Sequence, residues 1–220
     1  MATTVADLLV RVRNLLQDQD GVRWVDDELV RWVNDAQREI VLLKPDSYST
    51  RTTHSCVSGT LQNLPSDGLQ ILDVTRNLDG TKRAIRLVSR YILDAENPTW
   101  HSATESSDIR VFTFDERAPT SFYVFPPAQA AAQIEILYST APPVVSLVSN
   151  LSLNDIYVGA IVDYVCYRAF SKDAEYAQNG TRAETHYVKF MNSLGVKAQV
   201  EKTEGPNEQY NAAYIQRGTR

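Results

Sequence analysis

The first 46 residues repeat apolar positions with the period of an α-helix. Thr4 followed by Asp7 is typical of a helix start, because the threonine hydroxyl can accept a hydrogen bond from a backbone N–H group of the first turn. Gly21 interrupts the pattern, and a second apolar stripe begins after the acidic residues 26–28 and ends before Pro45. We therefore expect two amphipathic helices. Their buried faces are predicted to include Leu8, Val12, Leu29 and Trp32.

A different pattern covers residues 47–149, where β-branched and aromatic residues gather in short runs separated by Gly, Pro, Asn and Asp. Turn-forming residues predict a hairpin at 77–80 and a longer turn at 115–120. Residues 89–96 have the spacing of a short helix, and the prolines at 126–127 are expected to end a strand. We predict an antiparallel β insertion. The strand-like runs are TRTTHSCV, LQILDVTRNL, RVFTF, SFYVF and AQIEILY.

A third helix is predicted after the insertion. Asn154 can cap it, and Asp163 and Arg168 are the only charged residues between positions 156 and 170. Because this helix is apolar nearly all round, we expect it to lie at the centre of the fold and to contact the N-terminal pair. Its buried residues are expected to include Ile161 and Val165.

A fourth helix is predicted to end at Gly195, because Thr181 and Glu184 fit the capping box at a helix start. Asn179 and Gly180 immediately before it are typical of a turn. Its buried face is expected to include Tyr187 and Phe190.

Residues 196–220 are polar, contain a Gly-Pro pair and lack a sustained apolar period, so we do not expect them to fold alone. The stretch nevertheless carries Tyr210, Tyr214 and Ile215. Two interpretations stand equally. The stretch is either a disordered tail or an arm that orders against a partner by placing these side chains in its grooves.

These patterns together predict an α+β protein. The expected architecture is a four-helix bundle formed by residues 1–46 and 150–195, with a β-rich insertion at 47–149 and an extended C-terminal arm at 196–220.

The net charge of −5 and the isoelectric point of about 5.2 argue against sequence-specific binding to DNA, which needs a basic surface. A local basic cluster spans residues 76–90, and we expect it to be a solvated face rather than a contact with an acidic partner. Cys56 and Cys166 lie far apart, which favours a reduced intracellular setting. No stretch has the roughly 18 apolar residues of a transmembrane helix, so we expect no membrane partner.

Candidate catalytic and metal-binding groups are sparse. Of the three histidines only His54 has a close cysteine, Cys56, and the two are expected to be neighbours on one face of a strand rather than metal ligands. The acidic groups at 26–28 and at 115–116 suit a helix start and a turn better than an acid and base pair. Known phosphate-binding and nucleophile motifs are missing from the sequence. We therefore expect no catalytic residues, no metal and no cofactor.

Four segments carry a resemblance to a known family. They resemble the head-to-tail adaptor (connector) proteins of tailed bacteriophages, and their layout is similar to that of the tail tubular protein A of short-tailed phages. Val25 departs from the pattern where such sequences often place a Ser or Thr helix cap, a role that Asp26 could take over. The segments are RWVDDELVRWVNDAQREIVLLKPD, FYVFPP, IEILYSTAPP and DYVCYRAFSKDAEYAQNGTRAETHYVKFMNSLG.

The resemblance implies a structural protein of the virion rather than an enzyme. Such proteins form a ring, commonly of twelve copies, that joins the portal protein to a tail or nozzle protein and lets genomic DNA pass without sequence-specific binding. The location implied is the virion neck, with the host cytoplasm during assembly. An acidic channel wall would suit the passage of DNA.

The resemblance also implies that the C-terminal extension reaches onto the portal. The residues expected to make this contact are Tyr210, Tyr214, Ile215, Arg217 and Arg220.

Two alternatives from other classes remain open. One is a phage or bacterial hydrolase acting on cell-wall sugars, with an active site in the β insertion that would use Asp115 and Glu116. The other is a receptor-directed β module that binds a host surface.

Overall fold

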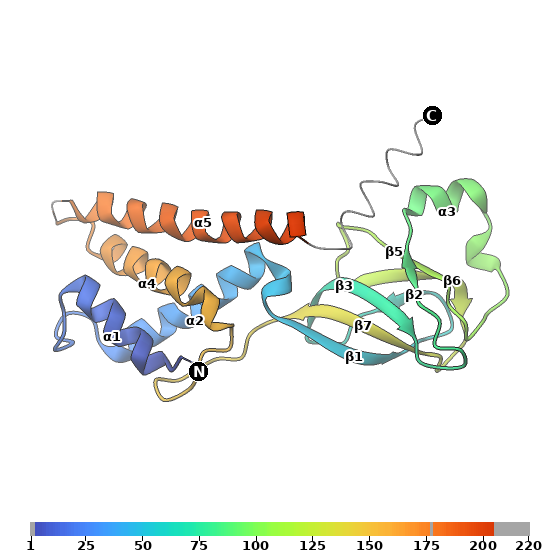
Figure 1. Ribbon diagram of the computed structural model, residues 1–220, viewed down its shortest axis with the longest axis horizontal. Coiled ribbons are helices and arrows are strands. Elements are labelled where there is room, and N and C mark those ends of the chain that lie inside the picture. Colours follow the sequence, from blue (N-terminus) through green and yellow to red (C-terminus); the bar gives the residue numbers. More distant parts are fainter. Residues whose placement is uncertain (1–2, 177, 205–220) are drawn as a thin grey trace. The chain divides into compact units, whose positions relative to one another are not determined.

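The computed structural model describes residues 3–176 and 178–204, and this part of the chain holds five α-helices and seven β-strands (Figure 1). The fold is α+β. The chain divides into two compact units, one made of residues up to Lys44 and from Pro142 onward, the other of residues Pro45–Ala141. We call them the helical unit and the β unit.

The helical unit begins with α1 (Val5–Leu16) and α2 (Asp26–Leu43). The predicted start of α1 is confirmed, since the Thr4 hydroxyl accepts a hydrogen bond from the Asp7 backbone N–H at 3.1 Å. The left-handed residue that ends α1 is Gln17, while Gly21, with φ of 68°, turns the chain toward α2.

The chain returns from the β unit through residues 142–154, which are bonded to both N-terminal helices. Backbone N–H groups of Val5 and Ala6 at the start of α1 donate to the carbonyl oxygens of Ser149 and Leu147. These N–H groups have no acceptor within their own helix, so the returning segment satisfies them.

Two buried amides on α2 hold the same segment. The Asn34 side chain accepts from the Val145 N–H at 2.8 Å and donates to the Val145 carbonyl at 3.0 Å. One turn later, the Gln37 side-chain oxygen accepts from the backbone N–H groups of Ser152 and Leu153. Asn34 and Gln37 are 8% and 1% exposed, so these bonds are made away from water. We call this pair the amide clamp.

The third long helix, α4 (Val158–Lys172), follows a single 3-10 turn at Asp155–Tyr157, where Asn154 caps the chain through its bond with the Ile156 N–H. As its nearly uniform apolar surface predicts, α4 packs against α1, α2 and α5 (Figure 1).

The prediction of a four-helix bundle is wrong. The last helix of the described chain, α5 (Asn179–Glu204), packs against α4 and makes no comparable contact with α1 or α2 among the described residues. Its buried residues, Ala183, Phe190 and Leu194, form a stripe wide enough for one neighbour only. In this arrangement α1 and α2 form one layer and α4 lies at the centre. Helix α5 packs against α4.

The predicted boundaries of α5 are also wrong. The helix starts at Asn179, which the sequence assigned to a turn, and passes through Gly195 to Glu204. One glycine costs a helix only about 1 kcal/mol. The good helix formers after Gly195, such as Lys197, Ala198 and Glu201, are enough to continue it.

The β unit contains two sheets whose inner faces share one core. One sheet has the order β1-β7-β3 and the other β2-β6-β5-β4 (Figure 1). Ile71, Val74, Ile134 and Ile136 of the first sheet join Phe122 and other residues of the second in a continuous buried cluster. The strands are β1 (Ser49–Ser55), β2 (Gly59–Asn63), β3 (Gly68–Asn77), β4 (Arg86–Leu87), β5 (Val111–Phe114), β6 (Ser121–Ala128) and β7 (Gln133–Thr140).

The predicted runs match β1, β3, β5, β6 and β7, but β2 and β4 were not predicted and β4 pairs with β5 in parallel. The expected strand end at the prolines 126–127 is wrong, because β6 continues to Ala128. By that point the pairing with β5 has ended at Phe125, so the missing proline N–H groups break no bond to that strand. The predicted short helix is confirmed as α3 (Arg90–Glu96).

Loss of the amide clamp should weaken the helical unit. In Asn34→Ala the buried N–H and carbonyl of Val145 would lose their partners, which should lower the free energy of unfolding by about 1–3 kcal/mol. Urea denaturation followed by circular dichroism would measure the change. Asn192→Ala, at an exposed site on α5, is the matched control and should leave the midpoint nearly unchanged.

Candidate interaction surfaces

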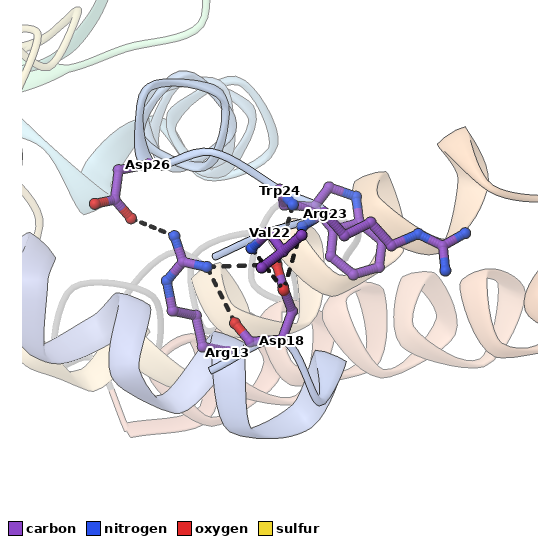
Figure 2. A network of polar contacts seen from close by, with 6 residues as sticks. All are labelled: Arg13, Asp18, Val22, Arg23, Trp24 and Asp26. Atoms are coloured by element: carbon purple, nitrogen blue, oxygen red, sulfur yellow. Dashed lines mark hydrogen bonds and ion pairs between the residues drawn. The ribbon is translucent and has the colours of Figure 1, made fainter. Parts of the chain in front are cut away.

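The loop between α1 and α2 is organised around one carboxylate, as Figure 2 shows. Asp18 accepts hydrogen bonds from the backbone N–H groups of Val22, Arg23 and Trp24 at 2.9–3.2 Å. Arg13 lies across the same loop, paired with Asp18 at 3.5 Å and with Asp26. The backbone of this loop is thereby fixed from within, and we call it the Asp18 corner.

Glycine is favoured at position 21 of this corner. A side chain there would approach the Arg13 guanidinium to 2.8 Å, and the positive φ of 68° also disfavours other residues.

Asp26 is bonded differently from what the sequence suggested. The residue before α2 is Val25, which makes no side-chain cap, and Asp26 is the first helical residue and pairs with Arg13 (Figure 2). The expectation that Asp26 takes over the cap is therefore wrong. Its charge still lies at the helix start, where a carboxylate is favoured.

The Asp18 corner is tied to the loop between α4 and α5 through Arg23. The Arg23 side chain pairs with Asp173, just after α4, at 2.6 Å and stacks over the rings of Trp24 and Tyr176. Lys172 at the end of α4 pairs with Glu28 of α2 in the same region. The α1–α2 loop and the α4–α5 loop are thus held together by charge and by aromatic contact.

The hydrogen bonds at Asp18 change its acidity. The N–H of Trp24 is the main cause that lowers the pKa of Asp18 below the ordinary value of 3.8, with smaller contributions from Arg23, Val22 and the charge of Arg13. The carboxylate is therefore the favoured form in the folded protein.

One flank of α5 is apolar and exposed. Tyr187, Val188 and Met191 are 37%, 50% and 37% exposed, beside the buried Phe190. The Tyr187 ring lies 4.9 Å from that of Tyr167 on α4, which extends the apolar surface across both helices. We call this surface the α5 flank.

The eight residues expected in the bundle core can now be placed. Tyr187 differs from the others, because it lies on the exposed α5 flank. The other seven are each 7% exposed or less: Leu8, Val12, Leu29, Trp32, Ile161, Val165 and Phe190.

The residues expected to bind the portal lie outside the described part of the chain. They are Tyr210, Tyr214, Ile215, Arg217 and Arg220.

Three of the five basic residues in the 76–90 cluster are paired with neighbouring carboxylates. Arg76 pairs with Glu135, Arg83 with Asp108 and Arg90 with Asp94. This surface therefore does not present a uniform positive field.

Within residues 3–176 and 178–204, no three His, Cys, Asp or Glu side chains gather as a metal site would require. His54 packs its ring against Phe122, and burial lowers its pKa. Burial, with a smaller effect of Asp79, raises the pKa of Cys56 to about 12, which keeps the thiol protonated and unreactive. Asp115 accepts the Arg117 N–H within the turn that the sequence predicted.

A histidine–carboxylate pair on α4 and α5 was not anticipated. His186 Nδ1 lies 2.8 Å from Asp163 Oδ1, and the imidazole stacks on Phe170. His186 also lines a hollow together with Gln178, Thr181, Arg182 and Thr185. The available signal was Asp163 itself, since a lone carboxylate in an apolar helix needs a partner.

In the described chain no helix is both long and apolar enough to cross a lipid bilayer.

An exposed apolar surface such as the α5 flank is typical of proteins that act through contacts with other proteins. Comparison with known families identifies the particular kind of protein. The model of the SU10 adaptor protein family matches residues 3–210, so the chain belongs to this family. No curated protein matches the chain. Membership implies a phage adaptor, a structural protein of the virion neck that binds portal and tail partners.

Replacement of Asp18 should weaken the corner in a pH-dependent way. Because its pKa is lowered in the folded state, Asp18 stabilises the protein above the ordinary carboxyl range, and this stabilisation is lost as the pH falls through that range and below. Asp18→Asn should lower the free energy of unfolding at pH 7 by on the order of 1 kcal/mol, as for loss of a helix cap. The difference from the original protein should shrink below about pH 4.

Urea denaturation at a series of pH values would measure this difference. Asp20→Asn, two residues away on an exposed side chain, provides the comparison. Equal losses in the two variants at pH 7 would show that Asp18 does not organise the loop.

Proposed function

We propose that the protein assembles into a ring at the neck of a tailed phage, joins the portal to the tail, and lets genomic DNA pass through its centre. The observation that carries this proposal is the α5 flank, an apolar surface on a helix whose one extensive contact within the described residues is with α4. Membership in an adaptor family supports the setting in the virion.

The α5 flank suits a contact between copies. A closed ring needs a head-to-tail interface, in which one surface of each copy meets a different surface of the next. Tyr and Met are enriched at the centres of protein interfaces, and the flank presents Tyr187 and Met191 around Val188. Covering these side chains would remove their exposed apolar area from water.

The charge of the protein suits DNA passage without tight binding. A wall that gripped phosphates would gain affinity with every free cation, because each contact releases counterions. The net charge is −5, and several arginines of the 76–90 cluster are paired with carboxylates. Both features favour the passage of DNA through the ring over binding of DNA to its wall.

The finer features of the proposal follow the family resemblance. We propose that the ring contains twelve copies, that its tail-side partner is a tail or nozzle protein, and that its layout is like that of tail tubular protein A of short-tailed phages. The C-terminal segment with Tyr210, Tyr214 and Ile215 is proposed to bind the portal.

A charge on the α5 flank should oppose ring formation. Val188→Glu would place a carboxylate within the proposed interface, and an unpaired charge there should weaken each contact by more than 1.4 kcal/mol, about tenfold in affinity. Native mass spectrometry and negative-stain microscopy, with and without portal protein, would count the rings. Val57→Glu, at a 58% exposed valine of the β unit, is the matched control. Unchanged ring formation in Val188→Glu would exclude the α5 flank as the interface.

Removal of residues 205–220 should weaken docking onto the portal without unfolding the described part of the chain. Helix α5 is retained in this deletion, so its thermal unfolding should stay close to that of the full chain. Co-sedimentation with purified portal protein would measure docking. Equal co-sedimentation of the two forms would rule out a portal-binding arm.

A further inference from the structure

The two sheets of the β unit have four outer edges, and three of them are protected against pairing with another strand. The ladder between β3 and β7 has three register shifts, and residues 83–85 return along the free side of β3 through bonds such as Ile85 N–H to the Thr75 carbonyl. β2 is five residues long with an irregular register, and β4 has two residues. Short length, bulges and cover are the usual means of protecting an edge.

Within the β unit, no described residue gives the fourth edge, β1, any of these protections. β1 is seven residues long and pairs with β7 in a continuous register without a shift. It contains no proline and no lysine, and its one charged side chain, Arg51, is paired with Glu135. The residues of β1 are exposed or half-buried along its whole length.

The hydrogen bonds at the two ends of β1 show which of its backbone N–H and carbonyl groups point away from β7. The Thr140 N–H donates to the Tyr48 carbonyl, and the Cys56 N–H donates to the Ala132 carbonyl. In an antiparallel ladder, residues that bond the neighbour alternate with residues that face away from it. Even-numbered residues of β1 therefore bond β7. The residues whose N–H and carbonyl groups point outward are Ser49, Arg51, Thr53 and Ser55.

We propose that β1 receives an extended segment of a partner protein, which adds a strand to the β1-β7-β3 sheet in the assembled particle. The proposal rests on the proposed adaptor function for its setting. Main-chain hydrogen bonds to the four outward residues supply the affinity in this mode of recognition. Because β1 displays mainly Ser and Thr, the fitting segment is extended, free of proline, rich in β-branched residues and low in charge.

The occupant is a partner rather than a second copy of this chain. Among the described strands the other three edges are protected, so the edge-to-edge pairing of two copies that is open to β1 is with another β1. Such a pairing is two-fold and stops at two copies, whereas a ring uses head-to-tail contacts.

The first test removes one outward N–H group. Thr53→Pro deletes a donor that β7 does not use, so the strand can keep its own ladder while a partner strand loses a bond and meets the proline ring. Thr53→Ala keeps the N–H and is the matched control. We expect Thr53→Pro to lower binding to purified portal or tail-side protein at least about tenfold, with Thr53→Ala close to the original protein.

The second test needs no variant. Hydrogen–deuterium exchange at single-residue resolution would compare the Arg51 and Thr53 amides in the free protein and in the assembled neck complex. We expect fast exchange in the free protein and at least about tenfold slower exchange in the complex. Exchange that stays fast in a complex whose rings are visible would overturn the β1 proposal and leave the ring proposal standing.

Two other outcomes would also overturn it. A free protein that is a dimer by native mass, with slow exchange at Arg51 and Thr53, would show that a second copy covers β1. If no ring and no portal complex formed at all, the adaptor proposal would fail, and the partner strand with it.

Discussion

The helical unit depends on the hydrogen bonds that bind its two halves across the inserted β unit. Its first two helices precede the insertion and its last two follow it, so nothing in the local sequence brings them together. The returning segment is bonded to the start of α1 by backbone carbonyls and to α2 by Asn34 and Gln37. Buried amides of this kind strongly favour one arrangement of the chain, because an unmade hydrogen bond in a dry site costs more free energy than a made bond contributes. They set the register in which α4 enters between its neighbours.

The opposite end of the helical unit is closed by charges instead of amides. Asp18 fixes the α1–α2 loop through hydrogen bonds, and Arg23 of this loop pairs with Asp173 just after α4. The helical unit thus has fixed loops at one end and a fixed linker at the other. On the α5 flank, the apolar side chains of Tyr187, Val188 and Met191 remain 37–50% exposed. Rigid surroundings lower the ordering cost of any contact made there.

Periodicity predicted the parts of this fold that local sequence determines. The starts of α1 and α2, the central position of α4 and the strands β1, β3, β5, β6 and β7 follow from spacing, acidic first turns and turn residues. The strand β2 was missed because Thr60 is its only β-branched or aromatic residue, and β4 was missed because two residues carry too little pattern. The end of α5 was misplaced because a single glycine was treated as a stop, although the residues after it favour a helix. The prediction of a four-helix bundle was wrong because the apolar stripe on α5 was assigned to a core shared by all four helices, whereas α5 packs mainly against α4.

The interaction surfaces were less accessible from sequence, since each depends on contacts between distant residues. The bond between Asp163 and His186 joins two helices. The open edge of β1 is recognised only by comparison with the other three sheet edges, which are protected. The location in the virion neck comes from family membership and not from any single residue.

The β unit enters and leaves the chain at neighbouring points, since the Thr140 N–H is bonded to the Tyr48 carbonyl and Ser49 lies opposite Ser139. A segment whose two ends are adjacent can be exchanged as a cassette without lengthening or straining the helices that flank it. Evolution could therefore replace this module to suit a new tail while conserving the scaffold that carries it.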